Sequence, residues 1–204
     1  MRHGHGITRY QHERGDLAHE LAVFVAIDDP VKLSVLTLVN RGTMPRRLRA
    51  YAYCEWSLGP PRADLPAHVV TARDPARDGR PRDQRVQRGF PGRAAFLAAI
   101  PRPRSTTSDR LEVLGRFGSP RQPAALARER LGGRFGAGLD RARALEVEIE
   151  IPPGEERTIT FLLGQGRDRA AADALLARYA DPAAVTTARE RVATYWTTRS
   201  ARSR

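Results

Sequence analysis

Three histidines near the start of the chain, His3, His5 and His12, carry imidazole, the side chain that most often binds transition metals. A tetrahedral site needs three or four converging ligands, and no cysteine or carboxylate pattern of suitable spacing accompanies these residues. We therefore expect surface or loop histidines and no metal or other cofactor.

The adjacent carboxylates Asp28 and Asp29 have the chemistry of an acid–base pair, such as the pair that cleaves glycosidic bonds. Neighbouring side chains on an extended chain point to opposite sides, however, so the two do not easily flank one bond. Because Pro30 follows at once, the pattern favours a turn.

Two glycine-rich segments, 115–119 and 133–138, look like loops that cradle phosphate. Neither carries the Lys-Ser/Thr of a nucleotide-binding loop or a strand and helix in the required order. We expect irregular loops in which glycine supplies positive φ. No nucleophile elbow, zinc motif or Ser/His/Asp order stands out, so the residues alone define no catalytic set.

The single cysteine, Cys54, lies among Tyr51, Tyr53 and Trp56 and permits no internal disulfide. We expect a buried, inert thiol. The first residues lack the apolar region of a secretory signal, and no apolar run is long enough to span a bilayer. These features predict a cytoplasmic location and no membrane segment in this chain.

The net charge of +12 would suit nucleic acid, because cationic surfaces attract phosphate chains. Yet Lys32 is the only lysine, the arginines are scattered, and aromatic residues make up 6% of the chain. This composition is also what GC-rich coding produces. We therefore expect no nucleic-acid partner; nucleic-acid binding remains an alternative, which predicts steep salt dependence.

Period-two alternation dominates the first quarter of the chain. Leu17, Leu21, Val23, Val25 and Ile27 fall on one side of a predicted strand. The next strand, 31–39, is apolar on both sides, which indicates that both its faces are covered. A turn signal at 40–43 then predicts that 47–56 returns beside it, as in a meander.

The clearest alternation is in one segment, where apolar residues take turns with glutamates. Leu145, Val147, Ile149 and Ile151 would point to one side of a strand and Glu146, Glu148 and Glu150 to the other. This predicts one face in the core and one face exposed to solvent. We expect 158–163 to be the hairpin partner of this strand and 69–71 to form a short strand.

After residue 166 the apolar period becomes helical, with Ala171, Leu175, Leu176 and Tyr179 at helix spacing. Asp168 is a plausible N-cap, and a second helix is expected from about 183 to 196. The predicted organisation is a β-sandwich over 1–166 and the start of a helical linker over 167–204.

Several segments, in order, resemble glycoside hydrolase family 94, and most closely its cyclic β-1,2-glucan synthase branch. The segments are 2–6 with Tyr10, 28–33, 38–41, 53–59, 70–71 with Asp74, 93–96, 114–119, 123–126, 136–140, 153–155 and 162–164. Together they extend over nearly the whole chain.

The resemblance implies an all-β antiparallel supersandwich, similar to galactose mutarotase, with a short C-terminal helical linker. In that family the sandwich precedes an (α/α)₆ barrel that carries the general acid, so this chain alone is expected to be inactive. The implied partners are a β-glucan or gluco-oligosaccharide, the missing barrel and a homodimer mate. The parent synthase would associate with the inner membrane. Candidate sugar-contacting residues are Arg116 and Ser119, then Asp140, and the alternative is that they hold loop geometry.

The segment 79–88 departs from the family, which has an apolar strand there. Read one base out of frame with GC-rich codons, this segment and the tail 196–204 can both encode family-like sequence, so we hypothesise indels in the reading frame. A lost strand at 79–88 and missing upstream strands would leave sheet edges unpaired and the isolated chain poorly soluble. The alternative function is a free-standing carbohydrate-binding or oligomerisation module.

Overall fold

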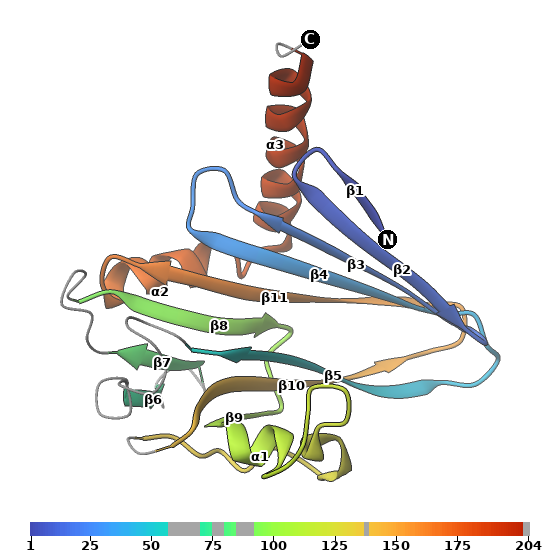
Figure 1. The fold of residues 1–204 in the computed structure, drawn as a ribbon. Coiled ribbons are helices and arrows are strands. Elements are labelled where there is room, and N and C mark those ends of the chain that lie inside the picture. The colour runs from blue at the N-terminus through green and yellow to red at the C-terminus, as the bar shows by residue number, and fades with distance from the viewer. Residues whose placement is uncertain (57–69, 75–79, 85–91, 137–138, 202–204) are drawn as a thin grey trace.

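The computed structural model describes residues 1–56, 70–74, 80–84, 92–136 and 139–201. Within these ranges two antiparallel sheets stack face to face (Figure 1). The large sheet has eight strands in the order β1-β2-β3-β4-β11-β8-β7-β6, and the small sheet has three in the order β5-β10-β9. The prediction of an all-β antiparallel fold is confirmed.

The bounds of the elements follow the chain. The large sheet contains β1 (Arg2–Gly4), β2 (Ile7–Arg14), β3 (Leu17–Val25), β4 (Val31–Asn40), β6 (Val70–Asp74), β7 (Arg80–Gln84), β8 (Ala94–Ile100) and β11 (Glu156–Gly166). The small sheet contains β5 (Arg46–Glu55), β9 (Ser105–Asp109) and β10 (Arg141–Ile151). The helices are α1 (Arg110–Leu114), the short 3₁₀ helix η3 (Ala124–Ala127), α2 (Arg169–Arg178) and α3 (Pro182–Ala201).

The large sheet is covered on both faces. One face packs against α2 and α3, where Phe24 and Leu33 meet Leu176 and Val192. The other face packs against the small sheet through the second core, formed by Leu38, Leu97, Trp56, Leu145, Val147, Ile151, Ile159, Phe161 and Ala99. β4 contributes to both cores, as its two-sided apolar pattern predicts, although helices cover one of its faces.

The C-terminal helices begin where the sequence predicts. The Asp168 carboxylate caps α2 by accepting a hydrogen bond from the Ala171 N–H at 2.7 Å. The second helix, α3, is longer than predicted, and Trp196 near its end packs over Gly6 in the β1–β2 turn. A Cβ built on Gly6, whose φ is +74°, would lie 2.3 Å from the Trp196 ring. The turn formed by His5 and Gly6 thus packs against the C-terminal part of α3.

Both predicted hairpins are wrong. β5 does not return beside β4 but crosses to the small sheet, where it pairs with β10. β11 likewise leaves β10 and pairs with β4 and β8 in the large sheet. A turn sequence reverses the chain, but it does not determine whether the next strand joins the same sheet or the facing one.

Asn40 joins these two crossings and is completely buried. Its side-chain amide donates to the Met44 carbonyl at 2.8 Å and to the Ile151 carbonyl at 2.9 Å. Its backbone N–H donates to the Glu155 carbonyl, and its own carbonyl accepts from the Gly154 N–H. One asparagine therefore fastens the β4–β5 connection to the β10–β11 connection.

The side of β3 that carries Leu17, Leu21 and Val23 is not its most buried side. Ala18, Ala22 and Phe24, on the opposite side, are the buried residues of β3. Val25 is 56% exposed, and Ile27 lies beyond the end of the strand. Alternation separates the two faces of a strand, but residue size alone does not reveal which face the helices cover.

The prediction that one face of β10 is exposed to solvent is also partly wrong, because Glu146 is fully buried. The segment that runs from 101 to 131 covers it: Ser105 Oγ donates to its carboxylate, and an Arg104 guanidinium nitrogen lies 3.5 Å away. Only Glu150 is exposed. The alternation is right, but a segment from elsewhere in the chain covers the polar face.

The predicted short strand is confirmed as β6 from Val70, and Val69 lies outside the described residues. The expected loss of a strand at 79–88 is wrong for its middle, because Arg80–Gln84 forms β7 between β6 and β8. Residues 79 and 85–88, and the tail end 202–204, lie outside the described residues. No helix in the described ranges is long and apolar enough to cross a membrane.

Candidate functional site

The loop that contains Arg116 and Ser119 follows the short helix α1; we call residues 115–122 the tip loop. Gly115 ends α1 with φ +84°, and a Cβ on Gly118 would lie 1.6 Å from the Leu114 carbonyl oxygen. The loop closes where the Gln122 N–H donates to the Ser119 carbonyl at 3.0 Å. The prediction of an irregular loop shaped by glycine is confirmed here.

The tip loop presents an aromatic ring and a guanidinium group to solvent. Phe117 is 94% exposed, and the guanidinium carbon of Arg116 lies 5.8 Å from the centre of its ring. Ser119 is exposed beside them. A ring offers stacking, and guanidinium and hydroxyl groups offer hydrogen bonds, so this loop has the chemistry to hold a polar ligand that has an apolar face.

Asp140 belongs to the base of α1, at the helix end opposite the tip loop. Its carboxylate lies 3.5 Å from Arg110, and its backbone carbonyl accepts from the Arg110 N–H at 2.7 Å. Arg110 also donates to Glu55 at 3.0 Å, and this hydrogen bond raises the pKa of Arg110. These contacts are those of a residue that holds loop geometry; contact of Asp140 with sugar stays a prediction.

Two buried carboxylates in the first turn of α1, Asp109 and Glu112, were not singled out from the sequence. Asp109 caps α1 and pairs with Arg134 at 2.7 Å. Glu112 accepts from Thr107 Oγ1 at 2.6 Å and from the Gly132 N–H. An acidic residue three positions after an N-cap aspartate is capping-box spacing, a signal that would have located the start of α1.

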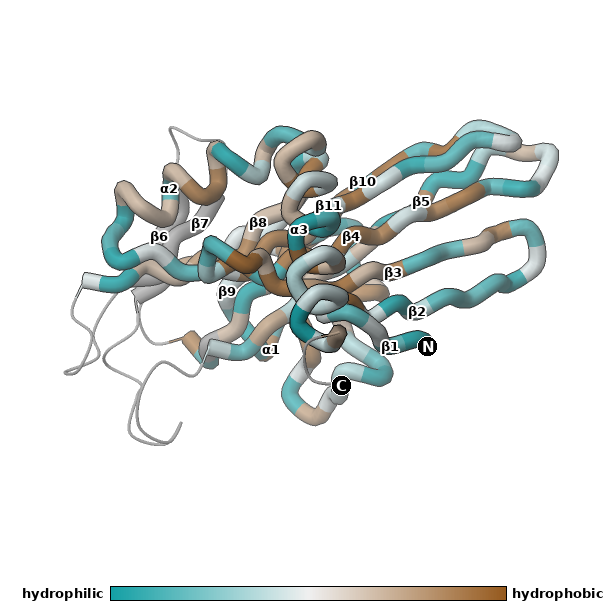
Figure 2. Tube along the Cα trace, turned by 90° about the horizontal axis from the view of Figure 1, so that it is seen from above, coloured by the Kyte–Doolittle hydropathy of each residue, from teal (hydrophilic) through white to brown (hydrophobic). Residues whose placement is uncertain are grey.

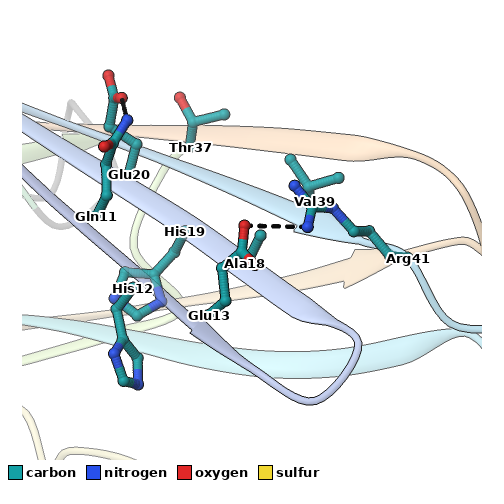
Figure 3. Close-up of a pocket in the computed structure, with 9 residues that line it drawn as sticks. All are labelled: Gln11, His12, Glu13, Ala18, His19, Glu20, Thr37, Val39 and Arg41. Carbon is teal, nitrogen blue, oxygen red and sulfur yellow. Dashed lines mark hydrogen bonds and ion pairs between the residues drawn. The ribbon is translucent and has the colours of Figure 1, made fainter.

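A groove on the large sheet is the second feature of interest; we call it the strand groove. It has a volume of about 530 Å³ and is formed by β2, β3, β4 and the residue after β4 (Figure 3). Its lining residues are Gln11, His12, Glu13, Ala18, His19, Glu20, Thr37, Val39 and Arg41. In Figure 3 the rings of His12 and His19 point away from Gln11, Glu20 and Thr37.

Sequence reasoning missed the strand groove because its residues come from three separate strands. The register brings them together: Glu20 pairs with Gln11 on one side and with Thr37 on the other. Such cross-strand neighbours are not visible in the linear sequence.

The histidines singled out from the sequence are all exposed: His3 is in β1, His5 in the β1–β2 turn and His12 in β2. His3 Nδ1 lies 3.0 Å from Thr8 Oγ1, and the rings of His12 and His19 are 5.3 Å apart. Within the described part of the chain, no three His, Cys, Asp or Glu side chains gather as metal ligands would.

Asp28 and Asp29 form the predicted turn, and each holds a different helix. Asp29 accepts from Arg178 and from the Tyr179 hydroxyl, both at 2.7 Å, at the end of α2. Asp28 pairs with Arg191 of α3 at 2.7 Å. The cavity between the turn and the helices, about 470 Å³, is thus lined by ion pairs that dock the helices.

Comparison with known proteins agrees with this fold. The model of the glycosyl hydrolase 94 supersandwich domain matches residues 1–182. Cyclic beta-(1,2)-glucan synthase NdvB of Rhizobium meliloti (strain 1021) is 34% identical over 164 residues, which are 80% of this chain and 6% of the synthase. Solabiose phosphorylase of Paenibacillus borealis is 29% identical over 174 residues, 79% of this chain and 22% of the phosphorylase.

Among solved structures, a polysaccharide lyase superposes with a TM-score of 0.45 at 12% identity, over 80% of this chain and 22% of the lyase. The chain is a β-supersandwich, and it belongs to the glycosyl hydrolase 94 supersandwich domain family. It spans only a small part of the length of the two curated relatives, which are a glucan synthase and a phosphorylase.

Proposed function

We propose that this chain is the non-catalytic, carbohydrate-binding β-sandwich portion of a family 94 glycosyltransferase or phosphorylase that acts on β-1,2-glucan. The family match and the two relatives support this proposal. In it the tip loop contacts a gluco-oligosaccharide, and the catalytic barrel is a separate partner, in the same polypeptide or in the other subunit of a homodimer.

The observation that carries the proposal is the exposed Arg116–Phe117 pair on a firmly held loop. The ring would lie against the apolar face of a sugar, while Arg116 and Ser119 would bond its hydroxyl groups. Within the loop, the Gln122 N–H donates to the Ser119 carbonyl at 3.0 Å, and Gly118 lies close against the Leu114 carbonyl oxygen, so the loop backbone is held in one shape. A pre-organised loop loses little conformational freedom on binding, which favours recognition.

Calorimetric titration of the chain with a β-1,2-gluco-oligosaccharide tests the proposal. We expect measurable binding, about tenfold weaker in Arg116→Ala or Phe117→Ala, because each change removes a contact at the exposed tip. Arg2→Ala is the matched control, since it removes one exposed arginine from the remote strand β1. Absence of binding by the unmodified chain, or equal binding by all variants, would contradict the proposal.

A further inference from the structure

The strand groove lies on the sheet face that α2 and α3 only partly cover. Toward one end of β2, β3 and β4 this face is apolar, with Ile7, Phe24 and Leu33 buried in the core beneath the helices. Farther along the same strands the face becomes polar, and the paired residues Gln11 and Glu20 occupy it instead of apolar side chains (Figure 3). The groove volume, about 530 Å³, is typical of sites that bind small molecules.

The polar side chains of the groove hold one another in place. The Gln11 amide donates to Glu20 at 2.7 Å, and Arg41 donates to Glu13 at 3.0 Å. Arg9 lies 3.6 Å from the other oxygen of Glu20. Each carboxylate has further lone pairs, so these oriented groups remain able to bond hydroxyl groups of a ligand.

Small apolar side chains lie between the polar groups. Ala18 pairs with Val39 across β3 and β4, and Val39 is half-buried. Together they give the groove a short apolar floor flanked by carboxylates, an amide and a guanidinium group. A sugar ring complements such a surface, because it has C–H groups on its faces and hydroxyl groups around its rim.

The charge of the groove distinguishes between ligand classes. Glu13 and Glu20 are balanced by Arg41 and Arg9, although the chain as a whole has a net charge of +12. Because these four charges cancel, a phosphate or a uronic acid would lose the hydration of its charge here without a net electrostatic attraction to compensate. A neutral, hydroxyl-rich ligand would not, and charged planar groups in fixed positions suit its many donors and acceptors.

We propose that the strand groove is a second carbohydrate site, which takes a neutral gluco-oligosaccharide on the face of β2, β3 and β4. The inference rests on the proposed function, because it assigns the same ligand class to a surface separate from the tip loop. A chain with two such surfaces holds a long glucan at two points and raises the effective concentration of each contact.

The test is titration of the full chain with a neutral β-1,2-gluco-oligosaccharide, using the double variant Gln11→Ala/Glu20→Ala. We expect its affinity to fall about tenfold, because both oriented hydrogen-bonding partners are removed. Glu190→Ala, which removes one exposed carboxylate from α3, is the control and should bind as the unmodified chain does. Melting curves verify that each variant is folded.

Two further results separate this inference from the proposed function. If Arg116→Ala weakens binding while Gln11→Ala/Glu20→Ala does not, the groove proposal is overturned and the proposed function stands. If only the groove variant weakens binding, the groove is the sugar site and the assignment to the tip loop fails. An oligouronide should bind the groove more weakly than the neutral glucan, and equal binding would overturn the charge argument.

Discussion

The two ends of one face of the large sheet are stabilised by different interactions, apolar packing at one end and hydrogen bonds at the other. At the end beneath the helices, Phe24, Leu33 and Leu162 form an apolar core with α2 and α3. At the other end the same strands carry the polar groove, and Asn40 fastens the adjoining crossings by hydrogen bonds. In Figure 2 the outer strand β2 is largely teal, whereas β4, which lies beyond β3 toward the middle of the sheet, is mainly brown.

The difference shows how one set of strands serves two purposes. Burial of apolar surface supplies stability where the helices pack, and each fully buried leucine contributes about 1.5–3 kcal/mol. The open end adds little burial, so its side chains are able to bond a ligand without loss of core packing. Four substitutions probe this contrast, and they are ordered by the size of the effect that we expect.

Leu33→Ala should have the largest effect, because Leu33 is completely buried beneath the helices. The loss of transfer energy and the remaining cavity should lower the free energy of unfolding by about 2–5 kcal/mol. Urea denaturation followed by circular dichroism measures this change. A loss below about 1 kcal/mol would show that the helices are not firmly packed on this face.

Asn40→Ala should lower the free energy of unfolding by about 1–3 kcal/mol, because it leaves the buried Ile151 carbonyl without the hydrogen bond that Asn40 donates. The same urea titration measures the change, with Asn40→Asp as a second variant that keeps the shape but loses the donor. If neither variant is destabilised, the two sheet crossings are held by other contacts.

Tyr179→Phe should lower stability by about 0.5–1.5 kcal/mol through loss of its 2.7 Å hydrogen bond to Asp29. Burial and this hydrogen bond raise the pKa of Tyr179 above its ordinary value of 10.0. The folded chain therefore keeps the proton while the unfolded chain releases it, so stability should fall as pH rises above about 10.

The phenylalanine variant should show a shallower alkaline decline, as urea titrations below and above about pH 10 would reveal. Burial also raises the pKa of Tyr51, so part of the decline should remain. An unchanged slope in Tyr179→Phe would mean that the hydroxyl contributes nothing to helix docking.

Thr37→Ala should have the smallest effect on stability, less than about 0.5 kcal/mol, because Thr37 is half-buried in the polar groove. The same variant should weaken glucan binding by a few-fold if its hydroxyl contacts the sugar. A large loss of stability would show that this end of the sheet is part of the core.

Sequence patterns suffice for features that depend on neighbouring residues. The N-cap at Asp168, the turn at Asp28–Asp29 and the two covered faces of β4 depend on residues close together in the chain, and all three are confirmed. The partners of β5 and β11 depend on residues far apart, and both hairpin predictions were wrong.

The candidate site divides in the same way. Gly115 and Gly118 predicted an irregular tip loop, because the need for glycine is local. Asp140, which follows the tip loop only after a further segment, does not join it and contacts Arg110 at the other end of α1. The strand groove could not be predicted, because Gln11, Glu20 and Thr37 become neighbours only through strand register.

The class of fold, the family, most of the strands and the two terminal helices could all be predicted from the order of the residues. Alternation and capping act over a few residues, and they therefore leave a signal in the linear chain. The sheet that each strand joins, the burial of Glu146 and the polar groove beside the helices became visible only in the folded chain. Those outcomes follow from burial between distant segments, which local preference does not encode.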